Sequence, residues 1–305
     1  MCKLWSYLFP KPTPVIEPVE EPIIEEPIEE EPEEEPEIII PEEKTEKYAL
    51  LVGINKYRPD LNCDLRGCVN DAIGIKEDLI NIFGFNNDNI RMLLNEQATY
   101  NNMLSNLRWL VDHEDAELVF GYSMHGSQTP DLNNEEIDGL DEVLVPYDHS
   151  WNVPLIDDII GEIVEKTPQS SFLTILADSC NSESASRGFF QDRRSLLLRK
   201  NKARCIKSNS DMQHEGIGLK KIGTRAPLNH VMYAACKDSE TAADAFIDGK
   251  WQGSFTAYRR KFWGNNKTWA SIHPDVLNTI RQHGFSQTPC LNGRELDTRP
   301  IFGGA

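Results

Sequence analysis

Two polar stretches hold the residue types that a nucleophilic site requires. His125 lies within Ser123–Gly126, Cys180 ends Asp178–Cys180, and each stretch directly follows an apolar run. Cysteine attacks carbon as its thiolate, and an adjacent imidazole assists formation of that thiolate. We therefore interpret Cys180 as a nucleophile and His125 as its general base.

Gly126 strengthens this interpretation. Glycine after the histidine allows close backbone approach, and we expect the N–H groups of Gly126 and Cys180 to stabilise an oxyanion. Taken singly, a cysteine at a strand end is more often a small buried hydrophobic residue, and a single histidine is more often a hydrogen-bonded structural group. The joint placement of the two residues after apolar strands favours catalysis.

Three other chemistries fit the sequence poorly. Gly121–His125 begins like the nucleophile elbow of a serine hydrolase, but it lacks the closing glycine and is expected to precede a loop. Cys63 and Cys68 lack a second ligand pair at zinc spacing. The sequence has no glycine-rich phosphate loop with its lysine, and we expect no organic cofactor.

The elements that must position these residues alternate along the chain. Apolar runs predict strands at 48–54, 90–94, 117–123, 172–178 and 230–235. Helical periodicity appears at 70–83, 99–111 and 154–165, with Gly84 ending the first helix and Thr99 capping the second. This order predicts an α/β domain with a mostly parallel central sheet, whose chemistry gathers at the carboxyl ends of the strands.

The net charge of the 305 residues is −18, and its source is uneven. Residues 1–46 contain 15 Glu, three Lys and nine of the 18 prolines, which leaves only −6 for the remainder. Such a segment buries too little apolar surface to offset its ordering entropy, so we expect a disordered, extended acidic tail. The acidic balance also disfavours nucleic acid as a partner.

Several features bear on the compartment. The apolar runs are shorter than the roughly 20 residues of a membrane-spanning helix, and Met1–Phe9 lacks the cleavage site of a signal peptide. Seven scattered cysteines indicate reduced thiols. We expect a cytoplasmic monomer without a membrane span.

Ordered blocks between Tyr48 and Gly293 resemble the metacaspases, a family of caspase-like cysteine peptidases. They include ALLVGINKY at 49–57, YSMHGSQTPD at 122–131, DSCNS at 178–182, GSFT at 253–256 and GFSQTPCLNG at 284–293. The resemblance implies a caspase-like three-layer sandwich over 47–305, with helices on both faces of a mostly parallel sheet. It also implies that His125 and Cys180 form the dyad of an endopeptidase.

The resemblance further implies a substrate pocket. The residues at the family positions that line the pocket for the residue before the cut are Cys68, Asp71, Ser123 and Asp178. Two carboxylates suit a cationic side chain, so the implied substrates are proteins or peptides cut after Arg or Lys. Without the resemblance, Asp71 would be interpreted as an acidic residue favoured near a helix N-terminus.

A calcium site is implied in the same way. Asp141, Asp157 and Asp158 match three carboxylates of the activating site of many metacaspases, and calcium prefers such oxygen ligands. A fourth carboxylate expected shortly after the nucleophile is absent, since residues 184–187 read Ser-Ala-Ser-Arg. Calcium activation is therefore one expectation, and acidic loop residues that bind no ion are the alternative.

Residues 187–228 form a basic insertion. Between Arg187 and Arg225 there are 11 Lys or Arg residues and three acidic ones. Long insertions within compact domains are usually functional or disordered, and we expect this one to be flexible. Self-cleavage at Arg193–Arg194 or Arg199–Lys200 is one hypothesis, and a solvated loop attracted to the acidic tail is the other.

Departures from the family pattern leave a second function open. Asn181 and Glu183 replace the usual His and Gly after the nucleophile, and Met124 replaces the common glycine before His125. None of these changes removes a catalytic atom. The alternative to an active endopeptidase is a catalytically weak caspase-like interaction module. Nucleic-acid binding through the basic insertion is the third hypothesis, which the lack of interleaved aromatic residues disfavours.

Overall fold

The computed structural model describes residues 45–130, 140–179, 202–203, 229–237 and 240–304. Almost all of the acidic tail and the basic insertion lies outside these ranges, so the predictions made for them stay predictions. None of the helices in the described part of the chain combines the length and apolar character that a membrane span requires.

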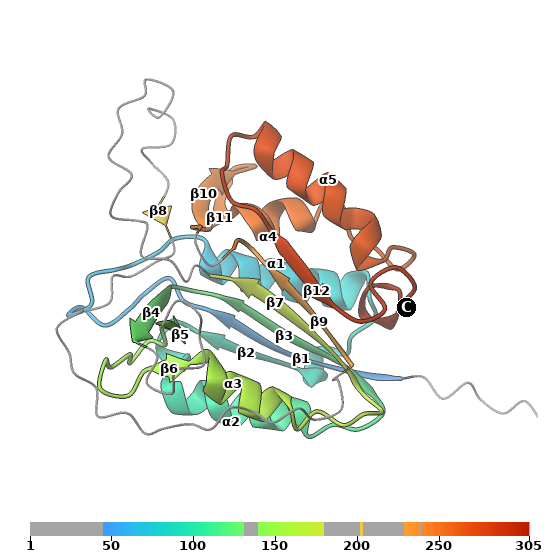
Figure 1. Ribbon diagram of the computed structural model, residues 1–305, viewed down its shortest axis with the longest axis horizontal. Helices are drawn as coiled ribbons and strands as arrows, with labels where there is room; N and C mark the ends of the chain where they lie inside the picture. The colour runs from blue at the N-terminus through green and yellow to red at the C-terminus, as the bar shows by residue number, and fades with distance from the viewer. Residues whose placement is uncertain (1–44, 131–139, 180–201, 204–228, 238–239, 305) are drawn as a thin grey trace, which may run out of the picture. The chain divides into compact units, whose positions relative to one another are not determined.

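A six-stranded sheet forms the middle layer (Figure 1), with the strand order β12-β9-β7-β3-β1-β2. In chain order these strands are β1 (Glu46–Gly53), β2 (Ile90–Leu94), β3 (Ala116–Ser123), β7 (Phe172–Asp178), β9 (His230–Ala234) and β12 (Cys290–Gly293). Only the β12–β9 pairing is antiparallel. The mostly parallel sheet predicted from the apolar runs is confirmed.

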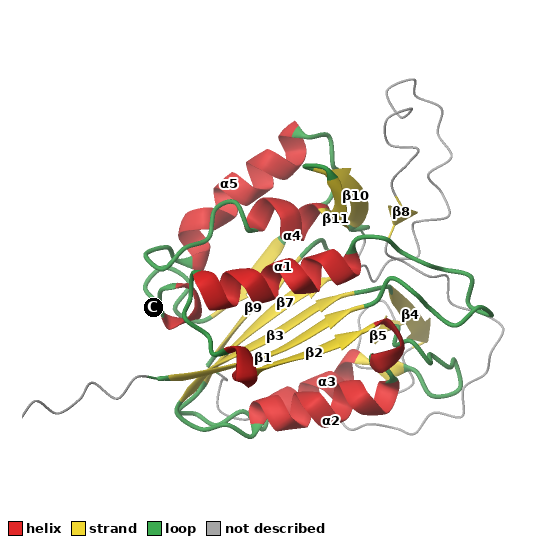
Figure 2. Ribbon diagram, turned by 180° about the vertical axis from the view of Figure 1, so that it is seen from behind, coloured by secondary structure: helices red, strands yellow, loops and turns green. Residues whose placement is uncertain are grey.

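Helices cover both faces of the sheet (Figure 2), which gives the three layers. On one side lie α1 (Cys68–Asn81), α4 (Ser254–Arg259) and α5 (Trp269–Gln282). On the other lie α2 (Tyr100–Val111) and α3 (Asp157–Val164). Every residue of β3 and β7 is buried because both sheet faces are covered.

The sheet divides the apolar core in two. Side chains alternate between faces along a strand, so Leu51 packs in the cluster on the α1 side and Leu50 in the cluster on the α2 side. The predicted Thr99 cap is confirmed, whereas α1 runs from Cys68 to Asn81 and not over 70–83, and Ile82 is its C-cap. The Thr99 side chain accepts the Asn102 N–H at 3.3 Å, and Gly84 has a φ of +70° just after α1.

Two small sheets complete the fold. One contains β4 (Gly126–Pro130), β5 (Leu140–Leu144) and β6 (Leu155–Ile156), and the other contains β8 (Lys202–Ala203), β10 (Ala243–Ile247) and β11 (Lys250–Gly253). Two expectations were wrong here. Strand β4, not a loop, begins at Gly126, and α3 starts at Asp157 rather than at residue 154, because residues 155–156 pair with β5.

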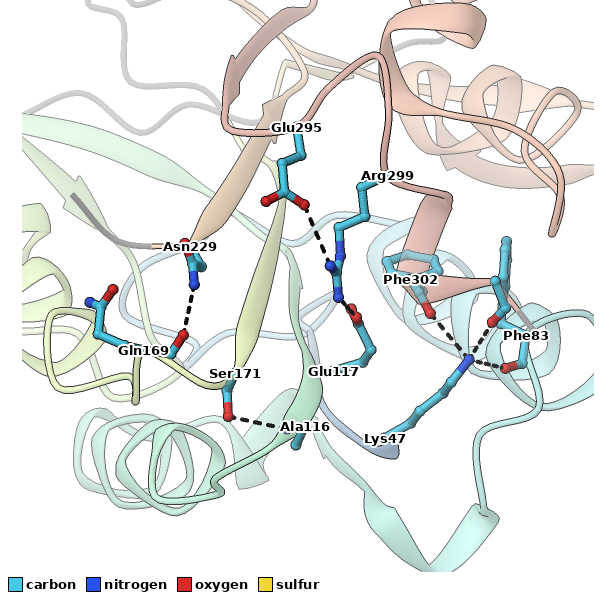
Figure 3. Close-up of polar contacts among 11 residues, drawn as sticks. Lys47, Phe83, Ala116, Glu117, Gln169, Ser171, Asn229, Glu295, Arg299 and Phe302 are labelled. Atoms are coloured by element: carbon cyan, nitrogen blue, oxygen red, sulfur yellow. Dashed lines mark hydrogen bonds and ion pairs between the residues drawn. The ribbon is translucent and has the colours of Figure 1, made fainter. Parts of the chain in front are cut away.

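Lys47, at the amino-terminal end of β1, ties the sheet to residues near the carboxyl terminus (Figure 3). Its buried ammonium donates to the carbonyls of Phe83 at 2.9 Å, Phe302 at 3.1 Å and Gly304. The buried carboxylate of Glu117 pairs with Arg299 nearby. These contacts lie at the end of the strands opposite to the predicted catalytic residues.

We predict that Lys47→Met lowers the free energy of unfolding by about 3 kcal/mol, because three buried carbonyls lose a charged donor. Urea unfolding of the purified protein measures this change. Lys56→Met is the matched control, since Lys56 forms an exposed ion pair with Asp64, and it should cost less than about 1 kcal/mol. Equal losses in the two variants would contradict the prediction.

Candidate active site

The tips of β3 and β7 carry the two predicted catalytic stretches to one edge of the sheet. The strands pair in parallel, and their last paired residues are Ser123 and Asp178. The Met124 N–H then donates to the Asp178 carbonyl at 3.4 Å. His125 follows the paired end of β3 by two residues, and Cys180 follows the paired end of β7 by two residues. Cys180 itself lies outside the described residues.

The His125 ring is buried, at 3% exposure, and held from the loop that follows β1. Its Nε2 lies 2.6 Å from the carbonyl oxygen of Cys63. A carbonyl only accepts hydrogen bonds, so we assign the proton of the neutral ring to Nε2 and the basic lone pair to Nδ1. Nδ1 is therefore the nitrogen that can take a proton from a nucleophile.

Tyr57 fixes the backbone of the same residue. The His125 N–H donates to the Tyr57 hydroxyl at 2.9 Å, and the two rings lie 5.2 Å apart between centroids. Sequence analysis missed this contact, although Tyr57 ends the block 49–57. It also missed the Cys63 carbonyl, because a backbone acceptor leaves no side-chain pattern.

Hydrogen bonds across its base hold this loop closed. The Leu65 N–H donates to the Asn55 carbonyl at 2.8 Å, and the Tyr57 N–H donates to Asp64 Oδ1 at 3.0 Å. The Asn95 side chain accepts the N–H groups of Asn55 at 2.9 Å and its neighbour at 3.0 Å. The loop therefore presents the Cys63 carbonyl and the Tyr57 hydroxyl from a fixed frame.

Asp71 is one of two buried carboxylates beside the strand tips. It is fully buried and accepts the Ser123 hydroxyl at 2.7 Å. Both of its oxygens also lie 3.0 Å from the Gly253 N–H, at the end of β11. Donors from the end of β3 and from the β11–α4 junction thus fix the carboxylate.

Asp178 is the second carboxylate, and α4 holds it. At 2% exposure, it accepts the Thr256 hydroxyl at 2.6 Å and the Thr256 N–H at 3.2 Å on Oδ2. Gly253 and Thr256 belong to the block 253–256, to which sequence analysis assigned no role. A site whose donors lie 182 positions from Asp71 and 78 positions from Asp178 cannot be derived from local patterns.

Cys68, which was also predicted to line the pocket, lies beside the end of β1. It is the first residue of α1 and is fully buried. A Cβ on Gly53 would meet the Cys68 carbonyl oxygen at 2.6 Å, so only glycine permits this approach of α1 to β1. Gly53 pairs with Ser123. The four predicted pocket residues, Cys68, Asp71, Ser123 and Asp178, therefore converge on one end of the sheet.

The three carboxylates predicted to bind calcium sit on the β5–β6–α3 segment. Asp141 is buried in β5, and Asp157 and Asp158 begin α3 directly after β6. The pair Val143–Ile156 brings these parts of the chain together. Within the described ranges, no group of three or more His, Cys, Asp and Glu side chains is arranged to hold a metal.

The fold matches that of the caspases. A TM-score of 0.63 relates the structure to protein GSU0716 from Geobacter sulfurreducens at 20% identity, over 85% of this chain and 99% of that one. Caspase-1 from Spodoptera frugiperda gives a TM-score of 0.52 at 12% identity, over 86% and 93% of the two chains. The predicted caspase-like sandwich is confirmed.

The sequence comparisons define the family. The family model "Metacaspase, peptidase C14 domain" matches residues 47–187. Metacaspase-1 of Schizosaccharomyces pombe is 31% identical over 81% of this chain and 67% of its own length. Metacaspase-1 of Candida glabrata is 32% identical over 66% of this chain and 60% of its own. The chain spans about two thirds of the length of these relatives.

The fold and the matched peptidase domain make this chain a caspase-like cysteine peptidase. Within that class it belongs to the metacaspase family, as the resemblance of its ordered blocks had implied.

We predict that Tyr57→Phe lowers kcat for peptide hydrolysis about tenfold with KM nearly unchanged. The ring stays in place, but the His125 N–H loses its acceptor and the imidazole its fixed position. Steady-state kinetics on a short peptide substrate measures kcat and KM separately. Tyr48→Phe, which alters a tyrosine stacked on His113, is the control and should leave both parameters unchanged. A normal kcat in Tyr57→Phe would show that this contact does not position His125.

Proposed function

We propose that this metacaspase is an endopeptidase that uses a Cys180–His125 dyad and cleaves after Arg or Lys. The observation that carries the proposal is the pairing of Ser123 with Asp178. It supports a dyad because His125 and Cys180 each follow by two residues. It supports a cationic specificity because the same end of the sheet carries two buried carboxylates.

The chemistry follows from the assigned histidine tautomer. His125 Nδ1 takes the proton of the Cys180 thiol, and the thiolate attacks the scissile carbonyl carbon. The N–H groups of Gly126 and Cys180 stabilise the oxyanion that forms. The imidazolium returns its proton to the leaving amine, which breaks the C–N bond and leaves a thioester. Water then hydrolyses the thioester and restores the thiol.

The Cys63 carbonyl supports both charge states of His125. It accepts the Nε2 proton of the neutral ring at 2.6 Å, and it accepts the same proton more strongly when the ring becomes an imidazolium. The contact therefore stabilises the charge that develops during attack. A carboxylate orients the base in many hydrolases, and a backbone carbonyl takes that position here.

The pocket chemistry supports a guanidinium or an ammonium before the cut. Asp71 and Asp178 are both buried, and donors fix them before substrate arrives. A cation that enters exchanges its hydration shell for preorganised acceptors, whereas a neutral side chain gains no charge attraction and an acidic one is repelled by the carboxylates.

Hydrolysis of fluorogenic peptides ending in Arg, Lys, citrulline or Asp tests the proposal. We expect Arg and Lys to be preferred at least about 100-fold in kcat/KM over uncharged citrulline. Cys180→Ala should lower kcat at least about 1,000-fold. Activity that survives this substitution would refute the dyad, and equal rates for Arg and citrulline would refute the specificity.

Asp71→Asn should raise KM for Arg peptides about tenfold or more and change KM for citrulline peptides little. The amide keeps the shape of the side chain but removes one of the two charges that attract the substrate. Asp78→Asn is the matched control, because Asp78 lies on the same helix and pairs with Arg260 at 2.6 Å. A similar loss for Arg and citrulline peptides would indicate damage to the fold instead of lost recognition.

Calcium activation and self-processing belong to the same proposal. In the described residues Asp141, Asp157 and Asp158 are not arranged as a metal site, so calcium would have to draw their carboxylates together. We expect its affinity to be weak, about millimolar, because a fourth carboxylate is also missing. The same peptide assay with and without Ca²⁺ tests this, with Asp157→Asn as the variant. Fragments ending at Arg194 or Arg199 in the wild type but not in Cys180→Ala would support self-cleavage.

A further inference from the structure

Arg259 is a buried cation for which the catalytic mechanism above has no use. It ends α4, is 0% exposed and is among the largest fully buried side chains of the described residues. Its guanidinium carbon lies 4.6 Å from the Phe255 ring and 5.1 Å from the Trp263 ring. Within the part of the chain that the structure describes, none of its three side-chain nitrogens has a hydrogen-bond partner.

Such an arrangement needs a compensating charge. Burying an ion without hydrogen bonds is costly, and contact with aromatic faces recovers only part of that cost. An isosteric apolar side chain would pack between Phe255 and Trp263 without this cost. The presence of a charge here therefore points to an electrostatic role.

The two pocket carboxylates supply the compensation. Burial lowers the pKa of Arg259 to about 10, while Asp178, Tyr233 and Asp71 act to raise it and Arg260 acts to lower it. Among the described residues these four groups act on the charge of Arg259: Asp178 lies on β7, Tyr233 on β9 and Asp71 on α1, and Arg260 follows Arg259 directly in the chain. Arg259 therefore stays protonated at neutral pH beside both carboxylates.

The helix geometry links Arg259 to the pocket. Thr256 and Arg259 are three residues apart on α4, so they share one face of that helix. The Thr256 hydroxyl on that face holds Asp178 at 2.6 Å. Arg259 acts on the same carboxylate by its field alone, since none of its nitrogens donates to a described residue.

We propose that Arg259 is a specificity-determining residue, an internal counter-cation that reduces the charge of the Asp71–Asp178 pocket from −2 to −1. The inference rests on the proposed cleavage after Arg or Lys. A pocket of charge −1 is neutralised by one monovalent side chain. It binds that side chain less tightly than two uncompensated carboxylates would, which lets a product ending in Arg leave the site.

Arg259→Met removes the charge and keeps an unbranched side chain between the two rings. We expect KM for Arg peptides to fall about fivefold, because the substrate cation no longer competes with a fixed one. Inhibition by a product peptide ending in Arg should tighten by a similar factor. KM for citrulline peptides should stay within twofold of the wild-type value. The same holds for kcat with Arg peptides, measured from initial rates before product accumulates.

Arg259→Lys and Arg259→Gln complete the experiment. The lysine variant keeps the charge and should stay within twofold of the wild type, whereas the glutamine variant should behave like Arg259→Met. Arg91→Met is the matched control, because the Arg91 guanidinium also lies over an aromatic ring, that of Trp109 at 3.8 Å, but on the edge strand β2. It should leave the ratio of the Arg and citrulline KM values unchanged. Thermal unfolding of all variants reports whether each one folds.

The outcomes separate the inference from the proposed function. An unchanged or higher KM for Arg peptides in the folded Met or Gln variant would overturn the inference, while the wild-type preference for Arg would still support the function. A wild type that does not prefer Arg over citrulline would overturn both. Failure of both neutral variants to fold, with Arg259→Lys folding normally, would make Arg259 a structural residue and would also overturn the inference.

Discussion

The parallel pairing of β3 with β7 is the constraint on which the site depends. Parallel neighbours end at the same edge of a sheet, and the register pairs Ser123 with Asp178. A shift by one residue would turn Asp178 to the opposite face and away from α4. Apolar packing on both faces fixes the register, since each strand is buried along its whole length. Packing in the core thus sets the separation of Ser123 and Asp178, the residues that the two predicted catalytic residues follow.

Fixed hydrogen-bond partners hold the ionisable side chains at the carboxyl ends of β3 and β7. Ser123 and the Gly253 N–H hold Asp71, Thr256 holds Asp178, and the Cys63 carbonyl holds His125. These contacts are formed in the absence of substrate, as preorganised donors and acceptors require. The proposed role of Arg259 extends the same logic, because a fixed charge tunes the affinity of a fixed pocket.

Much of the fold could be predicted from periodicity and local caps. The strands at 90–94 and 172–178 have their predicted limits because polar residues bound each apolar run, and Thr99 caps α2 through a local hydrogen bond. The β10–β11 hairpin was missed although Asp248–Gly249 carries its turn signal, with φ values of +50° and +84° at the two residues. The start of α3 was predicted too early, because residues 155–156 form strand β6 and pair with β5.

The site could be predicted only in part, for a physical reason. His125, Asp71 and Asp178 carry side-chain chemistry that a sequence displays, whereas the Cys63 carbonyl and the Gly253 N–H are backbone groups with no sequence signature. Arg259 appears in sequence as one more basic residue, and only its burial beside two carboxylates distinguishes it.

The most direct test of the account is a crystal structure of the enzyme with a peptide aldehyde that ends in arginine. The account predicts a hemithioacetal on Cys180, His125 Nδ1 within about 3–4 Å of the Cys180 sulfur, and the guanidinium between Asp71 and Asp178. An aldehyde bound to another residue, or an arginine side chain directed away from both carboxylates, would contradict it.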